Sequence, residues 1–191
     1  MSISVITPTI PPRADLLARA VASVVHQTIS PASHIIEWDL NHEGPAVTRN
    51  RAIQKADTEW LAFLDDDDAW YPYHLEQCLA HANETGADLI YPIWKYGHLS
   101  DPLGLFCRDF DPDELRERNY IPICTLVRTE WVRKVGGFPT GDDIPRINWQ
   151  PCEDWGLWLR LLDAGCRFEP LWQVTWQYSV HGKNLSGRTW K

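Results

Sequence analysis

The chain has 191 residues, of which 44% are hydrophobic and 23% are charged, as is usual for a folded globular protein. This composition excludes wholesale disorder, and the sequence contains no run of about 18 apolar residues that would predict a membrane span. Asp and Glu number 26 against 18 Lys and Arg, a formal net charge of −8, which disfavours a general nucleic-acid binder because such proteins are usually basic.

The length favours a single domain that buries enough surface to fold without disulfides or zinc. The five cysteines include no C-x-x-C pair, so we interpret them as reduced thiols. The N-terminal residues 1–8 have no basic segment before an apolar run, which is unlike a signal peptide. We therefore expect a cytoplasmic protein.

The first half of the sequence predicts alternating strands and helices. Short apolar, β-branched segments indicate strands at residues 2–7, 34–39, 60–64 and 88–93. Helical periodicity between them indicates helices at 13–27, 45–56 and 72–85. This order predicts an α/β fold with a mostly parallel sheet and helices on both faces. Such sheets bind ligands beyond the carboxyl ends of their strands, so we expect loops 8–12, 39–44 and 65–70 to converge.

The second half is less regular. Residues 94–120 contain several Pro and Gly, which favours a long excursion over the site. The remaining pattern predicts a strand at 121–128, a short helix at 129–135 capped by Thr129, a polar loop at 141–151, a helix at 153–164 and one or two strands at 167–178.

Four consecutive aspartates, Asp65–Asp68, end the third predicted strand. Adjacent carboxylates repel one another, and a strand end near the core is not freely solvated, so a cation is expected there. Carboxylate oxygens favour Mg²⁺, Mn²⁺ or Ca²⁺. The alternative is a solvated acidic turn before the next helix, and the pattern by itself leaves the two interpretations even.

Four further residues carry a charge or a titratable ring. Arg49, early in a helix, could reach a phosphate, or it could form an ordinary surface ion pair. Glu153 and Asp154 open a helix, where carboxylates are common simply because they cap the end and complement the dipole. His181 lies in a polar, Gly-containing segment and would matter only if it met the aspartates in space.

Together these segments resemble the family 2 glycosyltransferases of the GT-A fold. The matching stretches, in chain order, are SVITPT (4–9), AVASVVHQT (20–28), GPAVTRNRAI (44–53), WLAFLDDDDAWYP (60–72), VGGF (135–138), EDWGLWLRL (153–161) and VHGKNLS (180–186). Members of this family move a sugar from a nucleoside-diphosphate sugar, often a UDP-sugar, to an acceptor hydroxyl with a divalent cation. The resemblance implies one GT-A domain over 1–191, with a nucleotide-binding half (1–93) and an acceptor and catalytic half (94–191).

The resemblance also implies roles for individual residues. Asp65-Asp66-Asp67 matches the D-x-D motif, in which Asp67 would bind Mn²⁺ or Mg²⁺. Asp154 matches the general base, with Glu153 beside it, and His181 matches a late histidine of the metal or diphosphate site. The residues expected on the nucleotide sugar are Thr7, Pro8, Thr9, Asp39, Arg49, Asp65 and Asp66. Trp70 or Trp155 could stack on a sugar, although core packing is the commoner role.

The implied reaction is a single displacement that inverts the anomeric centre, since the sequence offers no separate nucleophile beneath the sugar. A catalytically inactive nucleotide-sugar or carbohydrate-binding module on the same fold is the main alternative. A nucleotidyltransferase is disfavoured because residues 7–15 contain neither Gly nor Lys. The resemblance favours UDP, but the link between Asp39 and Gly44 is shorter than in the family, which leaves the base open. The acceptor and the formation of a homo-oligomer also stay open.

Overall fold

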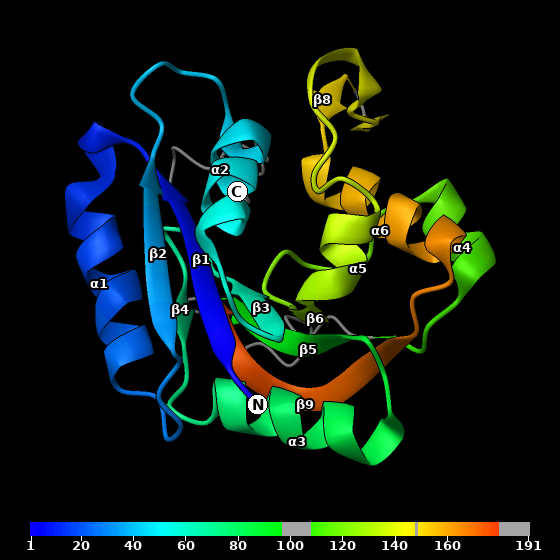
Figure 1. Cartoon of the computed structure of the whole chain (residues 1–191), viewed down its shortest axis with the longest axis horizontal. Coiled ribbons are helices and arrows are strands. Elements are labelled where there is room, and N and C mark those ends of the chain that lie inside the picture. Colours follow the sequence, from blue (N-terminus) through cyan, green and yellow to red (C-terminus); the bar gives the residue numbers. More distant parts are fainter. Residues whose placement is uncertain (97–107, 148, 180–191) are drawn as a thin grey trace.

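The computed structural model describes residues 1–96, 108–147 and 149–179. Seven strands form one sheet in the order β2-β1-β3-β6-β5-β9-β4 (Figure 1). Their bounds, in that order, are Ser33–Trp38, Ile3–Thr9, Trp60–Phe63, Leu126–Arg128, Leu89–Tyr96, Phe168–Tyr178 and Ala69–Trp70. Only β6 and β4 run against the other strands of this sheet. The predicted α/β fold with a mostly parallel sheet is therefore confirmed.

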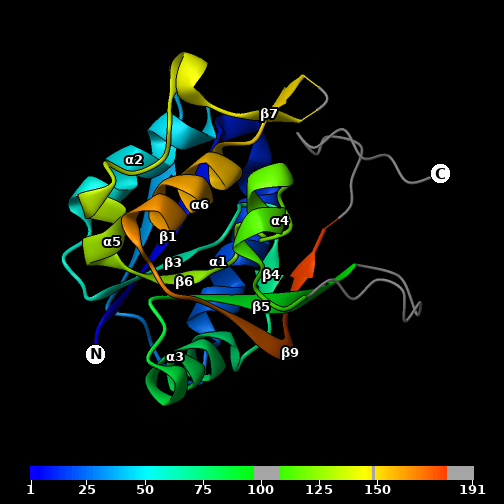
Figure 2. The ribbon, with the colours of Figure 1, turned by 90° about the vertical axis from the view of Figure 1, so that its right-hand side faces the viewer.

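Helices cover both faces of the sheet (Figures 1 and 2). One core lies under α1 (Ala14–Val25) and α3 (His74–Thr85), and the other lies under α2 (Pro45–Lys55), α4 (Pro112–Glu117), α5 (Thr129–Lys134) and α6 (Glu153–Ala164). Side chains alternate along a strand, so Val5 enters the first core and Ile6 the second. The sheet thus separates two apolar layers.

The loop between α5 and α6 is held against α2 by Asn50. Its amide donates to the Phe138 carbonyl at 2.9 Å and accepts from the Phe138 N–H at 2.9 Å. Gly137 has a φ of +78°, and a Cβ at this position would lie 2.4 Å from Asn50 Oδ1. Glycine is needed here both for the left-handed backbone and for the close approach of the amide. This clamp fixes the start of the α5–α6 loop to α2.

Several sequence expectations were wrong in detail. Thr129 does not cap α5: the N-cap is Arg128, and the Thr129 hydroxyl is buried without a hydrogen-bond partner among the described residues. The strand expected over 121–128 is reduced to β6, and β5 continues to Tyr96. The predicted loop at 141–151 contains a 3₁₀ turn, Gly141–Asp143, and a small hairpin of β7 (Arg146–Ile147) and β8 (Gln150–Pro151).

No helix in the described ranges is both long and apolar enough to cross a membrane. The expected excursion at 94–120 is only partly visible, because residues 97–107 lie outside the described structure. Within its visible part, α4 is an additional helix capped by the Asp111 carboxylate, which accepts from the Asp113 and Glu114 amides.

Candidate active site

The loops that follow β1, β2 and β3 meet at the carboxyl edge of the sheet, as expected. The Thr9 carbonyl accepts from the Asp39 amide at 2.8 Å, which joins the ends of β1 and β2. The Thr9 hydroxyl donates to Asp66 Oδ2 at 2.7 Å, which joins β1 to the loop after β3. Thr7 and Pro8 are buried within β1, and the Thr7 hydroxyl lies 2.9 Å from Nε2 of His34.

The aspartate run is not a solvated turn, so that alternative was wrong. Asp66, Asp67 and Asp68 are 2%, 7% and 1% exposed, and Asp65 is partly buried. Buried carboxylates require compensation. Arg13 lies 2.8 Å from Asp66 and 3.3 Å from Asp67. Burial, together with the charges of Asp67 and Asp65, raises the pKa of Asp68 well above its ordinary value.

Three of the four carboxylates could hold one cation. Asp65, Asp67 and Asp68 each offer an oxygen, and these oxygens lie within 4.8 Å of one another. Hard carboxylate oxygens of this kind fit Mn²⁺ or Mg²⁺. Asp66 is instead paired with Thr9 and Arg13. Asp68 was missed by sequence reasoning because it falls after the D-x-D triplet, although its place in a buried acidic run was a usable signal.

Arg49 links the aspartate run to the helix that carries the candidate base. It is 3% exposed, with Nη2 at 2.5 Å from Asp65 and Nη1 at 2.7 Å from Glu153. The alternative of a surface ion pair was therefore wrong. Burial opposes the charge on this guanidinium, but the two carboxylates outweigh burial and raise the pKa of Arg49 above its ordinary value.

Asp154 sits partly buried in the first turn of α6. Burial, and then the neighbouring charge of Glu153, raises the pKa of its carboxyl to about 7, although the Trp155 amide, Arg49 and the Asn119 side chain oppose the rise. The N-cap of α6 is Cys152, and it makes no side-chain cap hydrogen bond. A carboxyl that titrates near neutrality is matched to general-base work, which a simple helix cap would not require.

Asp39 closes the short link that precedes α2. Its two carboxylate oxygens accept from the Glu43 amide at 2.9 Å and from the Gly44 amide at 2.8 Å. Burial opposes its ionisation, but these two hydrogen bonds outweigh burial and hold the pKa of Asp39 below its ordinary value. The ionised Asp39 carboxylate, a hydrogen-bond acceptor, therefore lies at the end of β2, even though the link from Asp39 to Gly44 is short.

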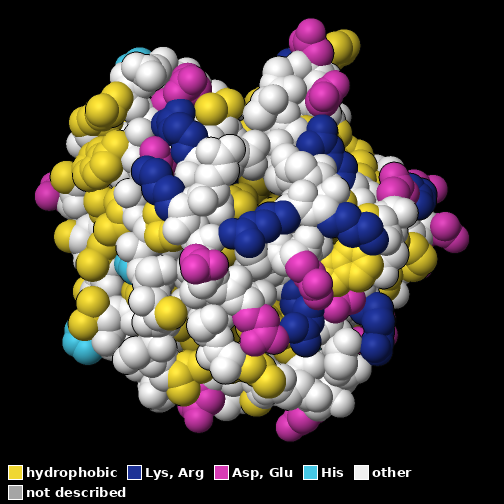
Figure 3. All heavy atoms as spheres, viewed as in Figure 1, with side chains coloured by type: hydrophobic (Ala, Val, Ile, Leu, Met, Phe, Trp, Pro, Cys, Tyr) yellow, Lys and Arg dark blue, Asp and Glu magenta, His cyan; other side chains and the backbone are white. Residues whose placement is uncertain are grey.

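Two tryptophans considered for sugar stacking belong to the core. Trp70 stacks on His74 with 4.2 Å between ring centroids, and the Trp155 indole donates to the Leu115 carbonyl at 2.7 Å. Trp149 at the tip of the β7–β8 hairpin is instead 90% exposed. In the space-filling view, a notch opens at the upper edge between the loop before α2 and this hairpin (Figure 3). His181 lies outside the described residues.

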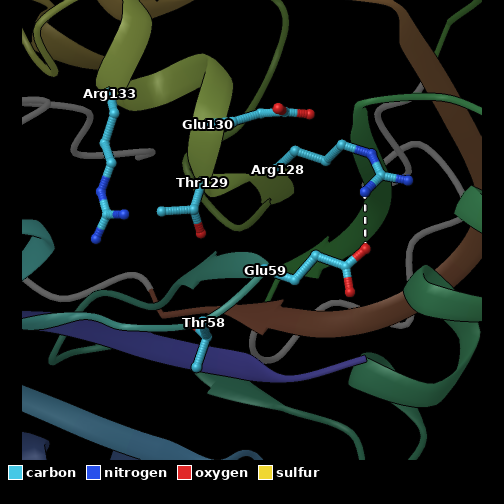
Figure 4. A pocket seen from close by; sticks show the side chains of 6 residues that line it. All are labelled: Thr58, Glu59, Arg128, Thr129, Glu130 and Arg133. Atoms are coloured by element: carbon cyan, nitrogen blue, oxygen red, sulfur yellow. Dashed lines mark hydrogen bonds and ion pairs between the residues drawn. The ribbon is translucent and has the colours of Figure 1, made fainter.

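A cavity of about 580 Å³ lies elsewhere, between the start of β3 and α5 (Figure 4). Its lining residues are Thr58, Glu59, Arg128, Thr129, Glu130 and Arg133. Because β6 is antiparallel to β3 and Arg128 pairs with Trp60, this cavity opens at the end of β3 opposite to Asp65. Arg128 is already paired with Glu59 at 2.8 Å and lies 3.5 Å from Asp88. Among the described residues, none of the expected site residues lines this cavity.

Known proteins that are similar to this chain are glycosyltransferases. A model of the family described as "Glycosyl transferase family 2" matches residues 29–104. The putative teichuronic acid biosynthesis glycosyltransferase TuaG of Bacillus subtilis is 28% identical over 177 residues, which cover 87% of this chain and 64% of TuaG. The pre-mycofactocin glycosyltransferase of Mycobacterium tuberculosis is 29% identical over 143 residues, which cover 68% of this chain and 29% of the relative.

Among solved structures, S. aureus TarS 1–349 in complex with UDP-GlcNAc superimposes with a TM-score of 0.75 at 18% identity. The match covers 98% of this chain and 61% of that one, so the chain spans less than two thirds of TarS 1–349 and of TuaG. The predicted resemblance to GT-A glycosyltransferases of family 2 is confirmed by these matches.

Proposed function

We propose that the chain is an inverting glycosyltransferase that moves a sugar from a nucleoside-diphosphate sugar, with a UDP-sugar favoured, to an acceptor hydroxyl. One observation carries this proposal: buried Arg49 connects Asp65 of a three-carboxylate cluster to Glu153, the neighbour of a carboxyl with a pKa near 7. The carboxylate cluster that would bind the cation on the donor side thus adjoins the carboxyl that would accept the proton. The UDP-GlcNAc bound to TarS supports the choice of donor by analogy of fold.

On the donor side, we assign nucleotide binding to the half formed by residues 1–93. Asp39 would accept from the base, and Thr7, Pro8 and Thr9 would line the nucleoside pocket. Asp65, Asp67 and Asp68 would hold Mn²⁺ or Mg²⁺, with His181 as a further candidate ligand. That ion would offset the negative charge that develops on the departing diphosphate. Arg49, Asp65 and Asp66 complete the proposed donor site.

On the acceptor side, we assign residues 94–191 to acceptor binding and catalysis. Asp154 would take the proton of the acceptor hydroxyl while the hydroxyl oxygen attacks the anomeric carbon. The bond from that carbon to the diphosphate oxygen breaks in the same displacement, which inverts the configuration. Glu153 is held by an ion pair with Arg49. We propose that Glu153, held in this way, helps to position the adjacent Asp154 and the donor sugar. Exposed Trp149 is the candidate for contact with the acceptor.

Thermal unfolding tests the donor side directly. The melting temperature would be recorded with UDP, GDP, CDP, ADP or dTDP, each with and without Mn²⁺. A nucleotide at 100 times its Kd adds about 2.7 kcal/mol of stability, which raises Tm by roughly 5–10 °C in a chain of this size. We expect this shift for UDP, only with Mn²⁺, and its loss in Asp67→Ala.

Asp142→Ala, which removes an exposed carboxyl of the 3₁₀ turn, is the matched control and should keep the shift. No shift with any nucleotide would count against a nucleotide-sugar site. A UDP shift in a protein that transfers no sugar would favour the inactive binding module instead.

A further inference from the structure

A second arginine, Arg13, reaches the aspartate run from the segment that follows β1. It ends the 3₁₀ turn Pro11–Arg13 and is the N-cap residue of α1. Its backbone N–H donates to the Ile10 carbonyl at 3.0 Å, and the two prolines before it have a fixed φ, so the backbone that carries this side chain is stiff. Arg13 lies between the stretches 4–9 and 20–28 that carry the family resemblance and belongs to neither.

One nitrogen of Arg13 lies between two carboxylates. Nη1 is 2.8 Å from Asp66 Oδ1 and 3.3 Å from Asp67 Oδ2. The two aspartate side chains are only 3% and 11% exposed, and the arginine side chain is 17% exposed. Because burying an ionised carboxylate is costly unless it is paired, this guanidinium supplies positive charge that Asp66 and Asp67 need.

The two contacts of Arg13 differ in what else their carboxylates do. Asp66 is fixed by the Thr9 hydroxyl, which donates to Oδ2 at 2.7 Å, and it is not one of the three carboxylates whose oxygens converge. Asp67 does belong to that cluster, together with Asp65 and Asp68, and its contact with Arg13 is the longer of the two. Arg13 can therefore give up Asp67 while it keeps Asp66.

A divalent cation and this guanidinium would compete for Asp67. A cation held by the cluster would lie against the Asp67 carboxylate, beside Nη1 of Arg13. Like charges at such short range repel, and the repulsion is strong where water is largely excluded. A diphosphate changes this balance, because its oxygens can accept from the guanidinium and coordinate the cation at the same time.

We propose that Arg13 is a resident competitor for the divalent cation. It holds Asp67 until a diphosphate takes up the guanidinium, so that the cation binds tightly only together with the nucleotide. This inference rests on the proposed function for the identity of the cation and the donor. The competition for Asp67 itself is measured without nucleotide, sugar or acceptor.

The test is a Mn²⁺ titration of the full chain, with free Mn²⁺ followed by electron paramagnetic resonance and no nucleotide present. We expect Arg13→Ala to bind Mn²⁺ at least about tenfold more tightly than wild type, because the repulsion is removed. The loss of a merely structural residue would not tighten binding. Arg13→Lys keeps the charge and should stay near wild type. Arg51→Ala removes a more exposed arginine on α2, so it controls for net charge and should change nothing.

The second arm repeats the titration with saturating UDP. The advantage of Arg13→Ala should then disappear, because in wild type the diphosphate takes up the guanidinium. The proposal is overturned by unchanged or weaker Mn²⁺ binding in Arg13→Ala without UDP, by an equal gain in Arg51→Ala, or by an advantage that persists with UDP. If Arg13→Ala does not fold, Arg13→Gln serves under the same criteria, since its amide can still donate to Asp66 but carries no charge.

Failure of this inference and failure of the proposed function give different results. Tighter Mn²⁺ binding in Arg13→Ala, in a chain that binds no nucleotide, would overturn the proposed function but not the competition for Asp67. Wild type that binds Mn²⁺ with UDP, without any gain in nucleotide-free Arg13→Ala, would overturn only the role of Arg13. No Mn²⁺ binding by either protein, with or without UDP, would overturn both.

Discussion

Arg49 and Glu153 form a largely buried ion pair, with 2.7 Å between Nη1 and Oε1, that joins α2 to the first turn of α6. The same guanidinium reaches Asp65 at the end of β3. The donor side and the acceptor side of the proposed site are therefore connected through the Arg49 side chain. We expect a change on one side to affect the other.

Removal of this guanidinium should be costly. Arg49→Ala leaves Asp65 and Glu153 without their partner, and breaking a buried pair in this way costs about 3–5 kcal/mol of unfolding free energy. Arg51→Ala, on the same helix, removes a more exposed arginine paired with Glu37 and Glu43 and should have a much smaller effect. Urea unfolding of both variants measures the difference, and equal losses would show that the Arg49 network does not stabilise the fold.

The raised pKa of Asp154 predicts a stability effect with a defined sign. The folded protein holds this proton up to about pH 7, whereas the unfolded chain releases it near pH 4. Between these values the native state binds more protons, so this group makes the protein progressively less stable as pH rises. Asp154→Asn should therefore gain stability relative to wild type between pH 4 and 7 and hold that gain above pH 7. Urea unfolding at pH 5 and pH 8 tests it, and a pH-independent difference would contradict the raised pKa.

Asp68 is expected to matter for cation binding although it lies outside the D-x-D triplet. Its carboxylate accepts from the Ser179 amide at 2.9 Å and also belongs to the cluster with Asp65 and Asp67. Asp68→Asn removes one charged ligand and should weaken Mn²⁺ binding in the presence of UDP by at least about tenfold. Asp142→Asn is the control. Electron paramagnetic resonance of free Mn²⁺ measures the Kd, and an unchanged value would remove Asp68 from the site.

The two glycines after α5 should differ in their tolerance of a side chain. Both have a φ of +78°, so a single alanine at either position costs roughly 1–2 kcal/mol of backbone strain. Gly136→Ala meets nothing within 4 Å, whereas at Gly137 the new Cβ would lie 2.4 Å from Asn50 Oδ1. Gly137→Ala should therefore lose about 1–3 kcal/mol more in urea unfolding. Equal losses of unfolding free energy would mean that Asn50 moves aside without destabilising the fold.

Much of the fold follows from local patterns in the sequence. The helix expected at 153–164 has those bounds in the structure, because an apolar stripe and a terminal glycine act within one element. The convergence of the three loops also follows from strand order alone. β6 is shorter than the expected strand, since pairing with β3 and β5, and not the apolar run itself, decides where it ends.

Most of the site depends on contacts between distant residues. Arg49 and Glu153 are 104 positions apart in the sequence, and no periodicity or motif predicts their ion pair. Arg13, the N-cap residue of α1, pairs with Asp66 and Asp67, which lie 53 and 54 positions further along the chain. These pairings arise from tertiary packing, which leaves no local signal in the sequence.

The most direct test of the proposed mechanism measures UDP release from a panel of UDP-sugars with candidate acceptors. The rate would be recorded from pH 5 to 9 for wild type, Asp154→Asn and Asp163→Asn. Asp163 is an exposed carboxyl on the same helix and serves as the control. We expect the wild-type rate to rise about tenfold per pH unit up to about pH 7 and then to level off. Asp154→Asn should lose about 10²–10⁴ in rate while it still binds UDP with Mn²⁺. A rate and pH profile in Asp154→Asn equal to those of Asp163→Asn would contradict the assignment of Asp154 as the base.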